Sequence, residues 1–319
     1  MQLRQTTFPE FFKWVQEEVK REIDRRIKDE NIRYALEGGK RLRPAMLLLS
    51  FKACNGSNEN YYKALESAMG VELAHSASLI HDDIMDNDMI RRGRPALHVK
   101  VGIGPAILIG HKMINMAFQI SLNHGMRDAQ IFLDAWNDTL IGQLKDIDFT
   151  AHLEKIMRGE SPEKLIREYF KIIEMKTASL FATACRAGAI EAEADEELIE
   201  TMQEYGREVG IAYQLADDFV DLMEGKTEEG IILPIIKIYG SVDEELLKKL
   251  QEGNLLSDAI KKHIEGLKEI YKEEIRKHIE RAKEIASLNI IPDSEYKELL
   301  KEAPHYIVNA MMENIGVTI

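Results

Sequence analysis

Several kinds of residue are scarce in this chain of 319 residues, and each scarcity excludes a class of protein. Only two cysteines occur, Cys54 and Cys185, which excludes a disulfide framework and a cysteine-rich zinc site and indicates a reducing compartment. Lysine and arginine number 42 against 55 acidic residues, a formal net charge of −13 that argues against nucleic acid or an anionic membrane as partner. The longest apolar runs, such as residues 45–49, are far too short to cross a membrane, and the N-terminus lacks the apolar stretch of a signal peptide. We therefore expect a cytoplasmic protein with no transmembrane segment.

Proline is also scarce, with eight residues, and strict alternation of apolar and polar residues is absent. Apolar residues instead recur at intervals of three and four, as in Ile166, Phe170 and Ile173, which is typical of amphipathic helices. Ser161-Pro162 provides a helix N-cap followed by proline at the first helical position. No stretch rich in proline, glycine or serine divides the chain, and 45% of its residues are apolar. The sequence predicts an all-α protein, a single helical-bundle domain over residues 1–319 around a central cavity.

The strongest signal is the pattern Asp-Asp-x-x-Asp, which occurs twice, beginning at Asp82 and at Asp217. Each copy follows an apolar helical stretch, where three acidic side chains are costly to bury unless something neutralises them. One such cluster alone could equally be an acidic helix end. Two clusters with apolar flanks indicate a binding site.

Helix geometry suggests what these carboxylates bind. Residues four apart share a helix face, so Asp82 points with Asp86 and Asp217 points with Asp221. Paired carboxylates suit Mg²⁺, which usually takes one or two carboxylates together with substrate phosphates. The two clusters therefore predict several Mg²⁺ ions that hold a diphosphate.

Basic groups that could bind a second polyanion lie near these clusters in the sequence. Residues 38–44 place three bases beside a Gly-Gly turn, and residues 91–95 add three arginines just after the first cluster. Glycine allows close backbone approach, and arginine can grip a phosphate with two donors. Lys176-Thr177 lies inside an apolar helical stretch. Each basic loop alone would be an ordinary surface turn, but their placement around two acidic clusters indicates a second anion site held by lysine and arginine.

These motifs, in this order and spacing, resemble the trans-isoprenyl diphosphate synthase (polyprenyl synthetase) family and are similar to its geranylgeranyl and polyprenyl diphosphate synthases. The resemblance covers roughly residues 38–234. The segments that carry it are GGKRLRP from Gly38, ELAHSASLIHDDIMD from Glu72, RRGRPALH from Arg91, GQLKD from Gly142, KTASLF from Lys176 and YQLADDFVD from Tyr213.

The resemblance implies a reaction that joins isopentenyl diphosphate head to tail to an allylic diphosphate, and it implies a homodimer. It also implies roles for individual residues. Mg²⁺ would hold the allylic diphosphate on Asp82, Asp86 and Asp217, with Asp83, Asp218 and Asp221 in support. The same diphosphate would contact Arg91, Lys176 and Gln214. Isopentenyl diphosphate would bind without metal to Lys40, Arg43, His75 and Arg92, with Gln143 and Asp146 in the cavity wall nearby.

The implied chemistry follows from these groups. Metal ions and bases would stabilise the departing diphosphate and so lower the barrier to ionisation. Lys176, Thr177 and Gln214 would supply oriented dipoles around the resulting allylic cation. The isopentenyl double bond would attack this cation, and loss of a proton would complete one five-carbon extension.

Product length would depend on the depth of the apolar cavity. In the family, a large aromatic residue five positions before the first aspartate gives short products, and here that position is Ala77. Its neighbour Ser78 and Ala74, further along the helix, are also small. Met113 on a following helix is a candidate floor, although ordinary helix packing would explain it equally well. Each isoprene unit needs about one helical turn, roughly 5 Å, of open channel. We expect products of C20 or longer, with a farnesyl (C15) product as the alternative.

The sequence departs from the family pattern in two places. Gly110-His111 stands where the family usually has Gly-Asp. The segment between Asp221 and Pro234 is shorter than usual and keeps one Gly-Lys pair, which makes Lys226 a candidate contact for the allylic diphosphate. A shortened loop would close the site less well over substrate.

Two other functions compete with a synthase. Terpene cyclases also use an Asp-Asp-x-x-Asp motif, but they lack the basic loop represented here by Lys40 and Arg43. A catalytically weak regulatory or lipid-binding subunit would explain the shortened loop, but such a subunit should have lost aspartates or bases, and neither set is missing.

Overall fold

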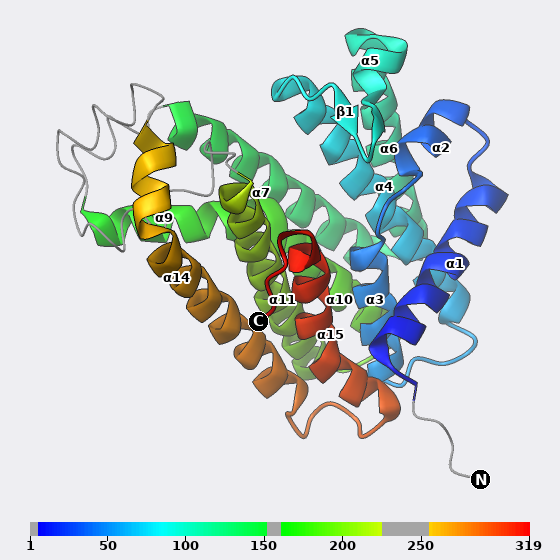
Figure 1. Ribbon diagram of the computed structural model, residues 1–319. Helices are drawn as coiled ribbons and strands as arrows, with labels where there is room; N and C mark the ends of the chain where they lie inside the picture. The colour runs from blue at the N-terminus through cyan, green and yellow to red at the C-terminus, as the bar shows by residue number, and fades with distance from the viewer. Residues whose placement is uncertain (1–5, 152–160, 225–254) are drawn as a thin grey trace. The chain divides into compact units, whose positions relative to one another are not determined.

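The computed structural model describes residues 6–151, 161–224 and 255–319, and these ranges are almost entirely helical, which confirms the all-α prediction. The helices are α1 (Phe8–Arg26), α2 (Glu30–Leu36), α3 (Leu42–Ala53), α4 (Tyr61–Met85), α5 (Leu97–Val101), α6 (Ile103–His124), α7 (Met126–Ala151), α9 (Pro162–Ile173), α10 (Ser179–Glu191), α11 (Glu196–Met223), α14 (Leu255–Ala286) and α15 (Glu295–Met312), with a π-helix η1 (Glu174–Ala178) and a 3₁₀ turn η2 (Glu313–Ile315). Figure 1 shows their course. No helix of the described residues is long and apolar enough to cross a membrane.

Contacts group these elements into two compact units, and each is described by itself. Unit 1 comprises residues 1–136, 180–206 and 286–300, and unit 2 comprises residues 137–179, 207–285 and 301–319. The expectation of a single domain over residues 1–319 stays a prediction.

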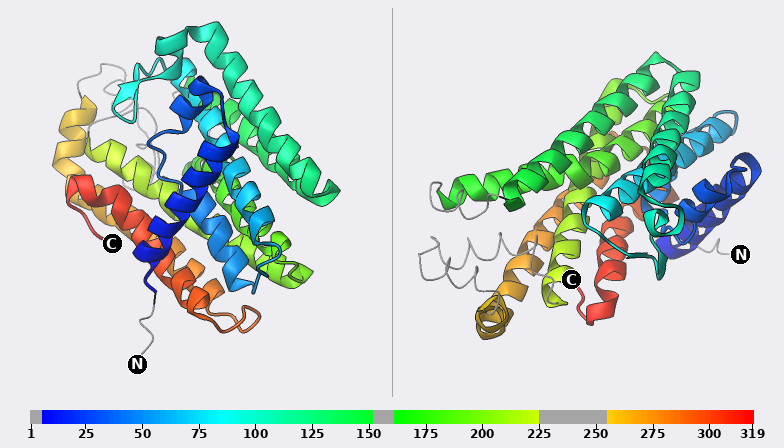
Figure 2. Two further views of the ribbon diagram at one scale, coloured as in Figure 1. Left: turned by 90° about the vertical axis from the view of Figure 1, so that its right-hand side faces the viewer. Right: turned by 90° about the horizontal axis from the view of Figure 1, so that it is seen from above.

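Unit 1 is organised around α4. This helix packs against α6 and α3, and α1 packs on α3 and α4 (Figures 1 and 2). Buried residues occupy almost the whole length of α3, which makes it the centre of this unit's core. Gly70 of α4 faces Ala117 and Ile120 of α6, where a Cβ would meet atoms of both residues at ordinary contact distances of 3.7–3.9 Å.

A two-stranded hairpin connects α4 to α5. Its strands, β1 (Ile90–Arg91) and β2 (Arg94–Pro95), are antiparallel, and Arg91 pairs with Arg94. The two turn residues, Arg92 and Gly93, have φ of 53° and 72°, as a tight hairpin turn requires. The hairpin therefore holds Arg92 in a backbone conformation that is uncommon for a residue other than glycine.

Unit 2 has its own apolar core. Its helix α9 begins where the sequence predicts a helix N-terminus. Ser161 caps that helix by accepting a hydrogen bond from the Lys164 amide, and Pro162 occupies its first turn. Helices α9, α11, α14 and α15 and the π-helix supply the buried residues, which include Ile173, Ala178, Leu215, Phe219, Tyr271, Ile275 and Val308. Two segments that carry predicted site residues, η1 and the end of α11, lie on adjoining elements of this unit.

Candidate functional site

The first aspartate cluster ends α4. Asp86 is the C-cap residue, and its amide donates to the Asp82 carbonyl at 2.8 Å. Asp82 is partly buried and Asp86 is exposed, whereas Asp83 is only 3% exposed. Asp82 and Asp86 thus stand on one face of the helix end, as the spacing predicts.

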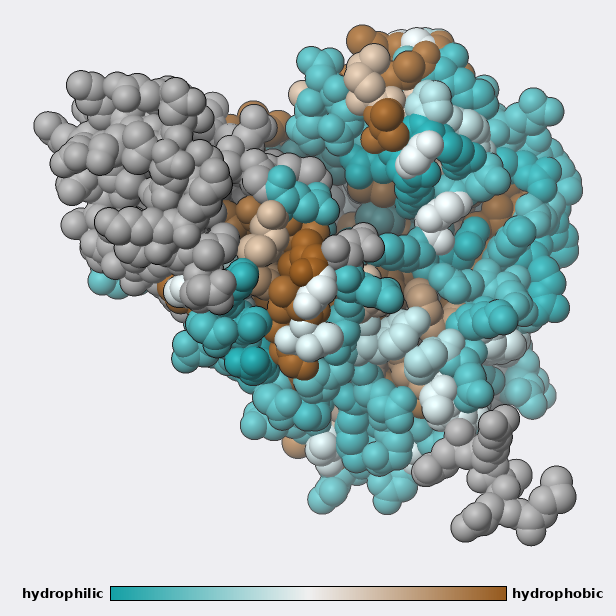
Figure 3. All heavy atoms as spheres, viewed as in Figure 1, coloured by the Kyte–Doolittle hydropathy of each residue, from teal (hydrophilic) through white to brown (hydrophobic). Residues whose placement is uncertain are grey.

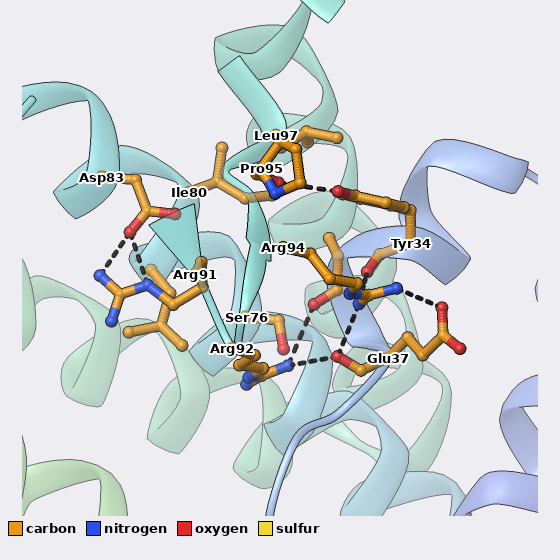
Figure 4. A pocket seen from close by; sticks show the side chains of 12 residues that line it. Tyr34, Glu37, Ser76, Ile80, Asp83, Arg91, Arg92, Arg94, Pro95 and Leu97 are labelled. Carbon is orange, nitrogen blue, oxygen red and sulfur yellow. Dashed lines mark hydrogen bonds and ion pairs between the residues drawn. The ribbon is translucent and has the colours of Figure 1, made fainter. Parts of the chain in front are cut away.

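Asp83 has a different partner. Its Oδ1 accepts a hydrogen bond from Nε of Arg91 at 2.6 Å and forms an ion pair with the same guanidinium (Figure 4). Burial raises the pKa of Asp83, and the hydrogen bonds from Arg91 oppose that shift. The carboxylate of Asp83 therefore orients Arg91, and its predicted support of the metal would act through that arginine.

The first basic loop leads into α3, where Arg43 meets α4 at His75, two turns before the first aspartate cluster. Arg41 adopts a left-handed conformation with φ of 58° and starts α3, which brings Arg43 to His75 of α4. Nη1 of Arg43 lies 3.1 Å from Nε2 of His75, and the guanidinium lies over the ring of Phe181 at 4.6 Å. Because arginine can only donate, Nε2 of His75 must accept, which assigns the ring proton to Nδ1. Lys40, in the same loop, is exposed.

Burial, followed by the charge of Arg43, lowers the pKa of His75 well below its usual value. His75 is therefore neutral near pH 7 and offers a donor and an acceptor without adding charge to a site that already holds several arginines.

The hairpin supplies the remaining arginine of this site. Arg92 donates through Nη1 to the carbonyls of Ala35 and Glu37, each at 3.2 Å, and these bonds fix its guanidinium. A small polar pocket of about 30 Å³ lies behind the hairpin, between α2 and α4, and Figure 4 shows Ser76 and Arg92 at its wall. The predicted residues Arg43, His75 and Arg92 thus belong to one side of unit 1.

Glu72 is a buried residue of this region that the sequence predictions missed. It is 1% exposed, and its Oε1 has no hydrogen-bond partner. A Cβ on Gly39 would lie 2.4 Å from that oxygen and 3.1 Å from Nη1 of Arg92, so a larger residue at position 39 would require the Glu72 carboxylate to move. Burial raises the pKa of Glu72, and Arg92, Arg41 and Arg43 oppose the shift. Glu72 stands one turn before His75 on α4, and that spacing is the signal that could have identified it.

In unit 2, the π-helix η1 brings two predicted residues to partners on other helices. Nζ of Lys176 lies 2.6 Å from Oδ2 of Asp146 on α7, and Oγ1 of Thr177 donates to Oε1 of Gln214 on α11 at 2.6 Å. Single-turn π-helices are frequent at functional sites. Gly142 of α7 lies directly against this turn, because a Cβ there would be 2.6 Å from the amide nitrogen of Lys176.

The second aspartate cluster lies near the end of α11. Asp217 and Asp221 are partly buried, and Asp218 is 6% exposed. Asp218 accepts hydrogen bonds from Nε2 of Gln214 at 2.8 Å and from the hydroxyl of Tyr169, a residue that the sequence predictions missed. The two clusters are therefore alike. Asp218, the second aspartate of its motif, is hydrogen-bonded to neighbouring side chains as Asp83 is, while Asp217 and Asp221 share a helix face.

These carboxylates fit the expected metal. Within the described ranges, no group of three or more His, Cys, Asp or Glu side chains is arranged to hold a metal ion by itself. Mg²⁺ commonly takes one or two carboxylates and completes its shell with phosphate oxygens and water, and each cluster offers one such pair of hard oxygen donors on one helix face. The predicted ligand roles stay predictions.

The chain-length candidates lie in the packed part of unit 1. Ala77 and Met113 are fully buried and Ala74 is 3% exposed, whereas Ser78 is partly exposed and donates to the His75 carbonyl at 2.8 Å. Gln143 is partly buried on α7. Lys226 lies outside the described residues. The roles of these residues stay predictions.

The structure gives a context for the unusual Gly110-His111 pair. The rings of His81 and His111 are 5.4 Å apart in an edge-to-face arrangement. A Cβ on Gly110 would lie 2.6 Å from Nε2 of His81, so glycine at this position makes room for that ring. His111 therefore contacts the residue that immediately precedes Asp82.

Comparison with known proteins identifies the family. The polyprenyl synthetase family model matches residues 25–232. A geranylfarnesyl diphosphate synthase of Methanosarcina mazei is 38% identical over 237 residues, which is 73% of this chain and 74% of that protein. A geranylgeranyl diphosphate synthase of the same organism is 39% identical over 60% of this chain and 57% of that protein. The solved geranylgeranyl pyrophosphate synthetase from Geoglobus acetivorans superimposes with a TM-score of 0.76 at 28% identity, over 94% of this chain and 99% of that one.

The chain therefore belongs to the polyprenyl synthetase family. This finding confirms the resemblance, the all-α isoprenoid-synthase fold and the assignment as a prenyltransferase.

Proposed function

We propose that the protein condenses isopentenyl diphosphate head to tail with an allylic diphosphate, in a Mg²⁺-dependent reaction that gives an all-trans prenyl diphosphate of C20 or longer. The observation that carries this proposal is the arrangement of α4. This helix bears a carboxylate pair, Asp82 and Asp86, and, seven residues earlier, a neutral His75 bonded to Arg43. Seven residues correspond to about 10 Å along a helix.

Two adjacent anion sites of different chemistry suit two diphosphate substrates. The carboxylates would hold one through metal, and the arginines would hold the other directly. A terpene cyclase, which ionises a single diphosphate, has no use for the second site. The alternatives of a weakly catalytic subunit and a C15 synthase stay open to the experiments below.

Predicted cationic side chains would serve the ionisation step. Bound Mg²⁺ would supply a Lewis acid that stabilises negative charge on the departing diphosphate. Lys176, held by Asp146, directs its ammonium from the π-helix, and Arg91, held by Asp83, directs its guanidinium from the hairpin. Both cations are fixed by buried or half-buried carboxylates before substrate arrives, so little reorganisation is needed when charge develops.

The proposal of C20 or longer rests on the small residues of α4 and on the names of the relatives. Ala74 and Ala77 leave the wall of the expected channel without a large side chain at the level where a C15 product would end. The two Methanosarcina mazei relatives are named geranylfarnesyl and geranylgeranyl diphosphate synthases. We propose a geranylgeranyl or longer product on these grounds.

We further propose that the protein is a homodimer and works in the cytoplasm. Ile103 and Leu108 of α6 are 57% and 68% exposed, Val99 of α5 is 42% exposed, and Figure 3 shows apolar residues gathered over α5. Exposed apolar surface of this kind marks an interface, and a second copy of the chain is the partner that the family suggests. Cys54 and Cys185 are buried free thiols, which suits a reducing compartment.

The experiment that tests the reaction follows inorganic diphosphate. The protein is incubated with farnesyl diphosphate and isopentenyl diphosphate, together and separately, with Mg²⁺ or EDTA. One inorganic diphosphate per added isoprene unit, released only with both substrates and Mg²⁺, supports the proposal. Release from farnesyl diphosphate alone would indicate a cyclase or hydrolase, and no release from folded protein would favour the weakly catalytic subunit or the C15 synthase.

A further inference from the structure

Tyr169 is a buried polar residue that the proposed reaction leaves unused. It lies on α9, is 4% exposed, and donates its hydroxyl hydrogen to Asp218. Tyr271 of α14 also forms a hydrogen bond with Tyr169, and its ring stacks on Phe219 with centroids 5.3 Å apart. Because the hydrogen of Tyr169 goes to Asp218, the hydroxyl of Tyr271 must donate to Tyr169.

The bond to Asp218 begins a continuous relay within unit 2. Asp218 also accepts from Nε2 of Gln214 at 2.8 Å, and Oε1 of Gln214 accepts from Thr177 at 2.6 Å. The bond from Thr177 therefore fixes the orientation of the Gln214 amide group. Asp218 accepts the hydrogen bond from the nitrogen of that amide. Four side chains from α9, α11 and η1 are fixed by one chain of hydrogen bonds.

The hydroxyl of Tyr169 matters to this relay more than its ring does. A phenylalanine would fill the same apolar volume, since Tyr169 lies in the core formed by α9, α11, α14 and α15. A phenolic hydroxyl is protonated at neutral pH and so can donate to Asp218. A carboxylate that is 6% exposed needs such donors to stay in place.

We infer that Tyr169 is a positioning residue, which holds Asp218, Gln214 and Thr177 and thereby aims the second aspartate cluster at the allylic diphosphate. The inference rests on the proposed function. Asp218 lies next to Asp217 on α11, so a carboxylate that rotates when its donor is lost disturbs the face that Asp217 and Asp221 share. Loss of an outer partner of this kind commonly costs about 10-fold to 100-fold in metal affinity or activity.

Tyr169→Phe tests the inference, and Tyr205→Phe is the matched control. Tyr205 is fully buried on α11, twelve residues or about 18 Å of helix before Asp217. Its hydroxyl donates to the Leu300 carbonyl at 2.7 Å in unit 1. Mg²⁺-dependent binding of inorganic pyrophosphate is measured by calorimetry, and kcat and both KM values are measured where turnover is found. Tyr169→Phe should weaken pyrophosphate binding and raise the KM of the allylic substrate about tenfold. The KM of isopentenyl diphosphate should not change, and Tyr205→Phe should alter only thermal stability.

A purely structural role would give a different pattern. If both variants lower the melting temperature and neither changes pyrophosphate binding, or if Tyr169→Phe raises both KM values equally, the inference is wrong. Should Tyr169→Phe fail to fold, Tyr271→Phe removes the donor to the Tyr169 hydroxyl and should weaken pyrophosphate binding about threefold; an unchanged affinity would overturn the inference. Absence of prenyl product from the unmodified chain would overturn the proposed function alone, because pyrophosphate binding is measured without turnover.

Discussion

The substitution Gly142→Ala should change the catalytic rate much more than the free energy of unfolding. A Cβ at this position would lie 2.6 Å from the Lys176 amide nitrogen and 2.9 Å from the Met175 carbonyl carbon. Both are backbone atoms, so no side-chain rotation relieves the contact. An ordinary contact begins at 3.4 Å, so the π-helix must withdraw by about 0.8 Å.

Two opposing terms set the change in unfolding free energy. Alanine is favoured over glycine inside a helix by about 1 kcal/mol, while overpacking typically costs about 1–3 kcal/mol. The net loss is therefore about 0–2 kcal/mol, which a protein of this size tolerates. A displacement near 1 Å in a catalytic group, by contrast, can cost roughly 100-fold in rate. We expect kcat to fall about 100-fold while the melting temperature falls by only a few degrees.

The assay compares this variant with Gly266→Ala. A Cβ on Gly266 of α14 meets nothing within 4 Å, so that substitution should stabilise the protein by up to about 1 kcal/mol and leave the rate unchanged. Steady-state kinetics and thermal unfolding are measured for both. A Gly142→Ala variant that keeps the wild-type rate would refute the claim that the π-helix positions Lys176 and Thr177.

Three further predictions concern the two anion sites and the channel. Asp82→Ala and Asp217→Ala should each abolish turnover with an unchanged helical circular dichroism spectrum, and a fully active Asp82→Ala would contradict the metal assignment. Ala77→Phe should shorten the main product, as mass spectrometry of the dephosphorylated alcohols would show, and an unchanged distribution would place the channel floor elsewhere. Because the folded-state pKa of His75 is lowered, the unfolded chain binds more protons below about pH 6.5, so stability should fall as pH drops through that value. His75→Gln, which keeps an acceptor for Arg43, should weaken this acid sensitivity in thermal melts from pH 7 to pH 5, and an identical pH dependence would show that other groups cause it.

Local patterns in the sequence predicted much of the fold and of the site. Helical spacing, the cap at Ser161-Pro162 and the repeated aspartate motif are all short-range signals, and the structure confirms the helices that they predict. The same geometry explains why Asp83 and Asp218 differ from their neighbours. Successive residues of a helix point about 100° apart, so the second aspartate of each motif cannot share a face with the first.

The remaining features depend on contacts between distant parts of the chain. Tyr169 meets Asp218 across 49 positions, and nothing local to either residue predicts the pair. Gly142 is constrained by the backbone of another helix rather than by a turn of its own, so its necessity is visible only in three dimensions. Glu72 could have been predicted from the sequence, because it lies one turn before His75. Its burial beside Gly39 and Arg92, however, depends on how two loops fold back onto α4.

The most direct test of the central claim is the length of the product. The protein is supplied with isopentenyl diphosphate, Mg²⁺ and, in separate reactions, dimethylallyl, geranyl or farnesyl diphosphate, and the dephosphorylated alcohols are identified by mass. We predict a discrete all-trans product of C20 or longer, formed from farnesyl diphosphate as well as from the shorter primers. A product that ends at C15, with farnesyl diphosphate left unextended, would contradict the channel that we expect beside Ala77, and no product from any primer in a folded protein would contradict the synthase itself.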